Sequence, residues 1–391
     1  MNPPAGRRVH RPVLYLDYNA TTPVAPEVLA AMLPFFADHF GNASSAHAPG
    51  WYAHEAVEAA RADVAALVGA SPEEVVFTSG ATEACALALR GVVQAYASKG
   101  RHLVVAATEH PAVMAEARAL EREGAELTVV PVRADGTLDP DVFAAALRPD
   151  TVVAAAMAAN NETGVCPDLP ALAEVCRARG VLLFSDATQA AGKVPVDFAH
   201  ADLLALSAHK FYGPKGVGAL VVRRRGPRVA LAAQVPGGGQ ERGRRGGTLN
   251  VPGIVGMGAA ARLALAMQDD EAARLEPLRG AMERHLVEAA EAVVNGFAAP
   301  RLPNTSSLTF PGVSADRLLS RLAGRLALAT GSACSSATRT PSHVLLAIGL
   351  SAEDARATLR ISLGRPTTAD DVRTATALLA DAVAAERTAS S

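Results

Sequence analysis

The sequence has few cysteines, almost no net charge and no long apolar run, and each shortage argues against a class of protein. Its four cysteines form no CxxC pair, which makes a disulfide framework or a zinc site a poor expectation. The formal net charge is −2, so the composition gives no reason to expect binding to nucleic acid or membranes. No apolar run reaches membrane-spanning length, and the N-terminus lacks the apolar stretch of a signal peptide. We therefore expect a cytoplasmic protein.

Hydrophobic residues, in contrast, are plentiful. They make up 50% of the 391 residues, which is enough for a large core and more than one domain. The loop at residues 79–83 is not a GxGxxG fingerprint, and this argues against a dinucleotide-binding fold.

Short apolar runs alternate with amphipathic segments between residues 75 and 222. This alternation predicts an α/β fold with a mostly parallel sheet and helices on both faces. A helix at 26–40 and a long helical region at 251–294, broken near Pro277, flank it. The pattern then changes to a smaller α+β domain. We expect a large domain at 14–262 and a small one at 263–391, with residues 1–13 packed nearby.

Lys210 follows an apolar run at residues 203–207, and a loop with Gly213 and Pro214 comes next. Ligands bind at the carboxyl ends of strands in α/β sheets, and a lysine there can form a Schiff base with a carbonyl cofactor. The alternative is an ordinary surface lysine.

Four further polar groups follow predicted strands. The small residues at 79–83 open a helix and suit an anion, although an N-cap is the simpler explanation. Asp186 could pair with a pyridinium nitrogen or cap a helix. His110 could stack on a ring and move protons, and Asn161 could donate to a phenolate oxygen; both also suit ordinary turns. Together with Lys210 these groups make up the parts of a pyridoxal-phosphate site.

Two residues lie outside this set. Cys334, among small polar residues, is the cysteine best placed to react, because Cys85 and Cys176 lie in apolar helical stretches and Cys166 lies in a turn. Arg360, on a predicted strand, could bind a carboxylate with two hydrogen bonds or form a structural ion pair.

The chain resembles the cysteine desulfurases of the NifS/IscS type, within the class V aminotransferase superfamily. The resemblance runs nearly end to end. Its most specific pieces are Phe40-Gly41-Asn42, Thr78-Ser79-Gly80-Ala81-Thr82-Glu83, Asn160-Asn161-Glu162, Ser207-Ala208-His209-Lys210, Gly246-Gly247-Thr248-Leu249-Asn250 and Gly331-Ser332-Ala333-Cys334.

This resemblance implies the type I fold of pyridoxal-phosphate transferases and a set of roles. Lys210 resembles the Schiff-base lysine, His110 the histidine stacked on the ring, and Cys334 the nucleophile that forms a persulfide. Arg360 and Asn161 resemble the groups that bind the substrate carboxylate. The other implied cofactor contacts are Ala81, Thr82, Asp186, Gln189, Ser207, His209 and, reaching from the other subunit of a homodimer, Thr248.

The resemblance further implies conversion of L-cysteine to L-alanine, with transfer of the sulfur to an acceptor protein for iron–sulfur cluster assembly or tRNA thiolation. Three alternatives stay open at this point. The chain could be a selenocysteine lyase, an aminotransferase for a small substrate, or a scaffold that has lost the cofactor.

Overall fold

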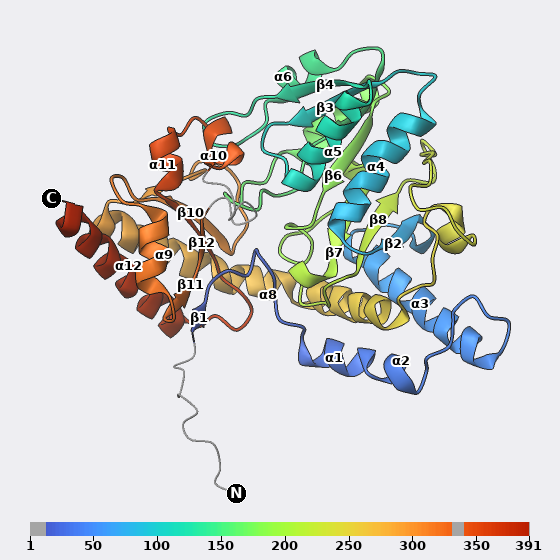
Figure 1. Ribbon diagram of the computed structural model, residues 1–391, viewed down its shortest axis with the longest axis horizontal. Coiled ribbons are helices and arrows are strands. Elements are labelled where there is room, and N and C mark those ends of the chain that lie inside the picture. The colour runs from blue at the N-terminus through green and yellow to red at the C-terminus, as the bar shows by residue number, and fades with distance from the viewer. Residues whose placement is uncertain (1–12, 331–339, 391) are drawn as a thin grey trace, which may run out of the picture.

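The computed structural model describes residues 13–330 and 340–390 (Figure 1). Within them, seven strands form the central sheet in the order β2-β8-β7-β6-β5-β3-β4. These strands are β2 (Val75–Thr78), β3 (His102–Ala106), β4 (Glu126–Val130), β5 (Thr151–Ala155), β6 (Leu182–Asp186), β7 (Leu203–Ser207) and β8 (Gly218–Val222).

The sheet is mostly parallel, as the sequence predicts. Strands β4, β3, β5, β6 and β7 pair in parallel, and β8 is antiparallel to both β7 and β2. Since two antiparallel pairings separate β2 from β7, β2 points in the same direction as the parallel strands. The carboxyl ends of six strands therefore meet at one edge of the sheet, where ligands bind in this class of fold.

Helices cover both faces because successive strand residues point to opposite sides. In β3, Leu103 and Val105 pack with α4 (Ala81–Ala95) and α5 (Pro111–Arg122). Their neighbours Val104 and Ala106 face α6 (Pro140–Ala146) and α7 (Leu169–Ala178). Further along the same face lie α3 (Ala48–Leu67) and the first half of α8 (Val251–Ala290).

Helix α8 is continuous, which corrects the predicted break near Pro277. A proline inside a helix costs about 3 kcal/mol, but buried side chains on both sides, such as Leu275 and Met282, hold the helix together. It is also the one helix among the described residues that is long and apolar enough to cross a membrane, contrary to the expectation above. However, 56% of its most apolar window is buried within the protein, as in a core helix.

The predicted helix at 26–40 is two helices, α1 (Pro26–Met32) and α2 (Pro34–Ala37). The interruption falls at Leu33, directly before Pro34, because a proline has no N–H to continue the helical hydrogen bonds, although Leu33 itself keeps an α conformation.

The rest of the chain forms a smaller α+β unit around an antiparallel sheet with the order β12-β13-β10-β9. Its strands are β9 (Val293–Val294), β10 (Thr305–Thr309), β12 (Ala329–Thr330) and β13 (Thr358–Ser362). The second half of α8, α9 (Ala315–Leu322) and α12 (Ala369–Ser390) cover this sheet. The start of the chain also belongs here, because β1 (Leu14–Tyr15) pairs with β11 (Leu326–Ala327).

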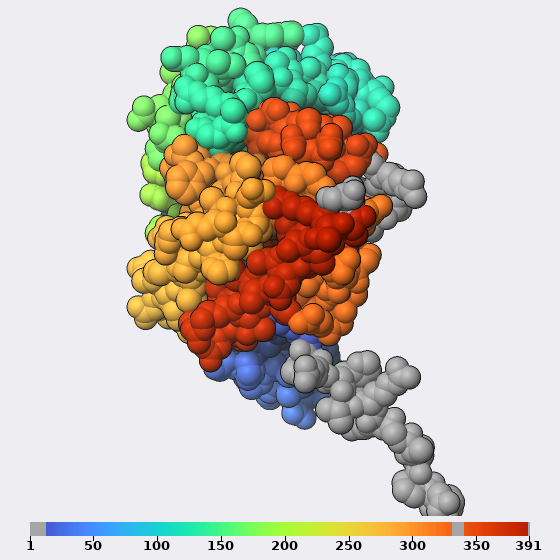
Figure 2. Space-filling model, turned by 90° about the vertical axis from the view of Figure 1, so that its left-hand side faces the viewer, coloured from blue at the N-terminus to red at the C-terminus, as the bar shows by residue number. Residues whose placement is uncertain are grey.

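Two short helices, α10 (His343–Ala347) and α11 (Ala352–Arg356), connect this unit to the large sheet. Leu345 and Ile348 pack beside Val132, which follows β4. Figure 2 shows this segment lying between the small unit and the part of the chain that carries α5 and α6. The predicted boundary at 262/263 falls inside α8, so this helix is shared by both units.

Candidate active site

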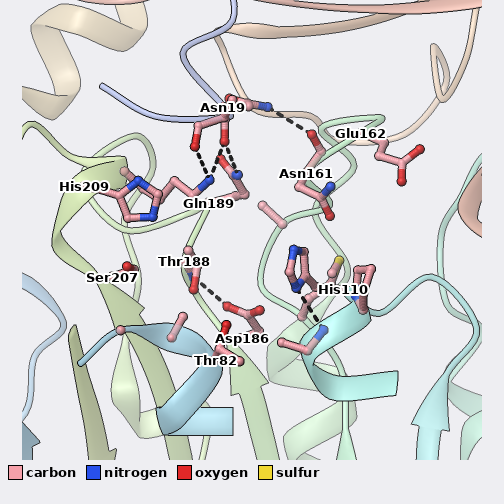
Figure 3. A pocket seen from close by; sticks show the side chains of 18 of the residues that line it. Asn19, Thr82, His110, Asn161, Glu162, Asp186, Thr188, Gln189, Ser207 and His209 are labelled. Carbon is pink, nitrogen blue, oxygen red and sulfur yellow. Dashed lines mark hydrogen bonds between the residues drawn. The ribbon is translucent and has the colours of Figure 1, made fainter. Parts of the chain in front are cut away.

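A cavity of about 910 Å³ opens at the carboxyl edge of the large sheet. This volume lies within the range of about 300–1,000 Å³ that is usual for small-molecule sites. Loops after β2, β3, β5, β6 and β7 line it, and so do Asn19, Arg360 of β13 and residues 340–343 of the small unit. The site is therefore built where the two units meet (Figure 3).

The loop after β2 forms a cradle for an anion. Helix α4 begins at Ala81, directly after Gly80, so its first amides face the cavity. The absence of a side chain at Gly218 allows this loop to pack closely against β8, since a Cβ on residue 218 would lie 2.7 Å from the backbone of Gly80. Ser207, at the end of β7, is buried beside it, and Thr82 and His209 complete this side of the cavity.

Asp186 ends β6 as a buried carboxylate, and one of its oxygens accepts the backbone N–H of Thr188 at 2.9 Å. His110 caps α5, where its Nδ1 accepts the N–H of Ala112 at 3.1 Å. Burial lowers the pKa of His110. The neutral ring consequently carries its proton on Nε2.

Lys210 lies in the turn after β7. Its Nζ donates to the backbone oxygens of Asn19 and Ala20, at 2.6 and 2.8 Å. Gln189 donates to the same Asn19 oxygen at 2.9 Å and accepts from Lys193 at 2.8 Å. Burial, with Lys210 and Arg360 nearby, lowers the pKa of Lys193 to about 7. Lys193 thus orients the amide of Gln189.

Arg360 enters from β13 and is almost fully buried. It pairs with Asp17 at 2.7 Å and donates to the backbone oxygen of Asn161 at 3.1 Å. Its Nε has no hydrogen-bond partner among the described residues, and neither does Oδ1 of Asn161. Both residues line the cavity, so polar atoms of a bound ligand or of water there could satisfy them.

The structure brings most of the predicted site residues together around this cavity: Ala81, Thr82, His110, Asn161, Asp186, Gln189, Ser207, His209, Lys210 and Arg360. Thr248 is exposed and does not line it. Cys334 lies outside the described residues. Burial raises the pKa of its rival, the Cys166 thiol, to about 11, so Cys166 stays protonated near neutral pH.

Several residues of the site escaped the sequence analysis. Asn19 donates to Thr305 and to the Asn161 backbone, so it connects both units with the Lys210 turn. Ser342, the N-cap of α10, donates to buried Glu162 at 2.6 Å. Glu109 is fully buried and accepts the N–H of Met157. Glu162 belongs to the Asn160-Asn161-Glu162 motif and Glu109 directly precedes His110, but only the fold reveals the contacts of the two carboxyl groups.

The residues present fit pyridoxal phosphate. The cavity offers free helix amides and polar side chains at one end for a phosphate, a buried carboxylate for a ring nitrogen and a lysine for an aldehyde. Among the described residues, the unsatisfied Oγ1 of Thr188 and Oδ1 of Asn161 also border this space, where a substituted ring could meet them.

Comparisons with known proteins agree with this geometry. The aminotransferase class-V model matches residues 14–374. A cysteine desulfurase IscS from Anaeromyxobacter sp. (strain Fw109-5) is 52% identical over 92% of this chain and 89% of its own. A solved NifS-like protein is 33% identical, with a TM-score of 0.88 over 95% of this chain and 99% of its own. The structure of SspA in complex with cysteine is 35% identical, with a TM-score of 0.79 over 89% of this chain and 98% of its own. The fold is thus the predicted one, and the chain belongs to the cysteine desulfurases of the class-V aminotransferase family.

Proposed function

We propose that the protein is a pyridoxal-phosphate-dependent L-cysteine desulfurase, which forms L-alanine and a persulfide on Cys334. The observation that carries this proposal is the meeting of Lys210, Asp186 and Arg360 in one cavity, from three separate elements. They provide an amine, a buried carboxylate and a buried guanidinium, which are the groups that this chemistry requires.

The phosphate would bind at Ala81, Thr82, Ser207 and His209, and the ring would lie between His110 and the residues after β6. Asp186 would pair with the ring nitrogen, and Gln189 and Asn161 would lie near the phenolic oxygen. When bound, pyridoxal phosphate supplies an electron sink for the substrate's α-carbon. Burial and nearby lysines lower the pKa of His209 to about 4, so this ring is neutral and can donate one N–H to an anion.

The substrate would be held by its carboxylate. The guanidinium of Arg360 is fixed by Asp17 and the Asn161 backbone, while its Nε remains unused by the described residues. A carboxylate suits this position. Lys210 then takes the α-proton on Nζ, and the oxygens of Asn19 and Ala20 hold the resulting ammonium in place.

Sulfur transfer belongs to Cys334. Its thiolate attacks the substrate sulfur, a sulfur–sulfur bond forms, and the bond between sulfur and Cβ breaks with its electrons left on the carbon. Protonation of Cβ, together with return of the α-proton from Nζ of Lys210 to Cα, leaves alanine. The neutral ring of His110 can donate a hydrogen bond from Nε2 toward the reacting atoms, because its Nδ1 is engaged by the amide of Ala112.

A homodimer is part of the proposal. Apolar side chains are exposed together on α1, α2, the start of α3 and the residues that connect them, which favours a covered face. They are Leu29, Leu33, Phe36, Phe40, Trp51 and Tyr52. Thr248, exposed and outside its own cavity, would serve the partner's phosphate site. The sulfur acceptor would be a protein of iron–sulfur assembly or tRNA thiolation, in the cytoplasm.

Replacing Cys334 tests the assignment of the nucleophile. Cys334→Ser should keep the cofactor and its visible absorbance but lose persulfide formation and alanine production, because serine cannot accept sulfur. Cys166→Ser is the matched control and should keep both, since its protonated thiol takes no part. Full alanine production by Cys334→Ser would show that another group is the nucleophile.

A further inference from the structure

The Gly/Arg-rich loop at residues 237–248 is attached to its own chain by two ion pairs, one to α3 and one to the first turn of α4 in the phosphate cradle. Glu241 accepts two hydrogen bonds from buried Arg61, each 2.8 Å long, and one from the N–H of Phe77 in β2. Further along the loop, Arg245 pairs with Glu83, the third residue of α4, through Nε at 2.8 Å. This loop is therefore the outer support of the cradle.

Glu83 is an unusual neighbour for an anion. It lines the cavity at the helix terminus where the phosphate would bind, and one of its oxygens accepts the N–H of Ser79 at 2.7 Å. Burial opposes its ionisation, but hydrogen bonds from Arg245 and Ser79 outweigh burial and lower its pKa. A bare carboxylate here would repel a phosphate, and both oxygens of Glu83 are within hydrogen-bond distance of Arg245.

We propose that Arg245 is a positioning residue for the cofactor phosphate: it cancels the charge of Glu83 and so allows Glu83 to brace the cradle without repelling the anion. Arg245 does not line the cavity of its own chain, so it acts on this site through Glu83. The inference rests on the proposed function, because it requires pyridoxal phosphate as the ligand.

The test is to titrate cofactor-free protein with pyridoxal phosphate and, separately, with pyridoxal, which lacks the phosphate. Arg245→Gln should weaken the apparent affinity for pyridoxal phosphate about tenfold, as expected for one uncompensated charge near the anion, and leave the affinity for pyridoxal unchanged. Arg245→Lys should restore most of the loss. Arg242→Gln is the control, since Arg242 lies in the same loop and donates to the exposed backbone oxygen of Glu73.

A double variant separates charge from structure. Glu83→Gln keeps an acceptor for the Ser79 amide but removes the charge, so adding it to Arg245→Gln should return the affinity for pyridoxal phosphate to near the wild-type value. If the double variant binds as weakly as Arg245→Gln, or if pyridoxal is weakened equally, Arg245 only holds the loop and the inference is wrong. Wild-type protein that binds no pyridoxal phosphate would instead overturn the proposed function.

Discussion

Burial controls the charge of the carboxyl groups around the proposed site. The side chain of Glu109 is fully buried, and burial, with Asp186 nearby, raises its pKa to about 8. Burial also raises the pKa of Glu162 to about 7, against the hydrogen bond from Ser342. Glu109 is therefore mostly protonated at neutral pH and Glu162 about half protonated, which limits the negative charge that accumulates around the cavity.

Glu109 should make the protein less stable as the pH rises. Between its ordinary pKa of 4.5 and about 8, the folded state holds a proton that the unfolded state has lost. Stability then falls with increasing pH by up to about 1.4 kcal/mol per unit. Glu109→Gln cannot titrate and keeps an acceptor for Met157.

The free energy of unfolding of Glu109→Gln, compared with that of the wild type, should therefore increase from pH 5 to pH 8. At pH 4 the difference between the two proteins should change little with pH. Denaturant unfolding of both proteins at each pH measures this difference. If the free energies of unfolding of the two proteins change with pH in the same way, the pKa of Glu109 is not raised.

At the level of elements, β7 matches the apolar run predicted at residues 203–207, because the run is fully buried and ends abruptly. The predictions for α1, α2 and α8 were wrong at Pro34 and Pro277. A proline destabilises a helix through its immediate neighbours in the sequence. Whether the helix continues depends on how well the residues on both sides of the proline pack in the core, which the sequence does not show.

The same distinction applies to the site. Lys210 and Asp186 could be predicted, because their place in a parallel sheet follows from the strands before them. The role of Asn19 could not, because its partners Thr305 and Ser362 are hundreds of residues away. The pairing of Arg245 with Glu83 spans 162 residues and was equally out of reach.

The contact between α10 and the loop after β5 should stabilise the junction of the two units. Ser342 caps α10 through the amides of Val344 and Leu345, and it also donates to Glu162. Ser342→Ala should lower the free energy of unfolding by about 2–4 kcal/mol, from a lost cap and an unsatisfied buried carboxyl group.

Ser351→Ala is the comparison for that experiment. The hydroxyl of Ser351 caps α11 by accepting the backbone N–H of Asp354 at an exposed position. Losing this cap should lower the free energy of unfolding by only about 1 kcal/mol. Chemical denaturation of the two variants gives the difference. Equal losses would mean that the bond to Glu162 adds nothing to the cap.

At the level of the whole molecule, the exposed apolar side chains on and beside α1, α2 and α3 predict a dimer. Sedimentation equilibrium should give twice the chain mass of 40.1 kDa. Combined Leu33→Asp and Phe36→Asp should give monomers, because charged groups would be buried at the interface. Phe297→Asp, a substitution at another exposed aromatic residue, should leave the dimer intact. A wild-type monomer, or a double variant that stays dimeric, would exclude this face as the interface.

The most direct test of the central claim is the absorbance spectrum of the purified protein before and after addition of L-cysteine, with the products measured in the same sample. We predict a visible band of bound pyridoxal phosphate that is absent from Lys210→Ala and changes when L-cysteine is added, with alanine and transferable sulfur formed in equal amounts. A protein that stays colourless after incubation with pyridoxal phosphate, or one that yields a keto acid and no alanine, would contradict the account.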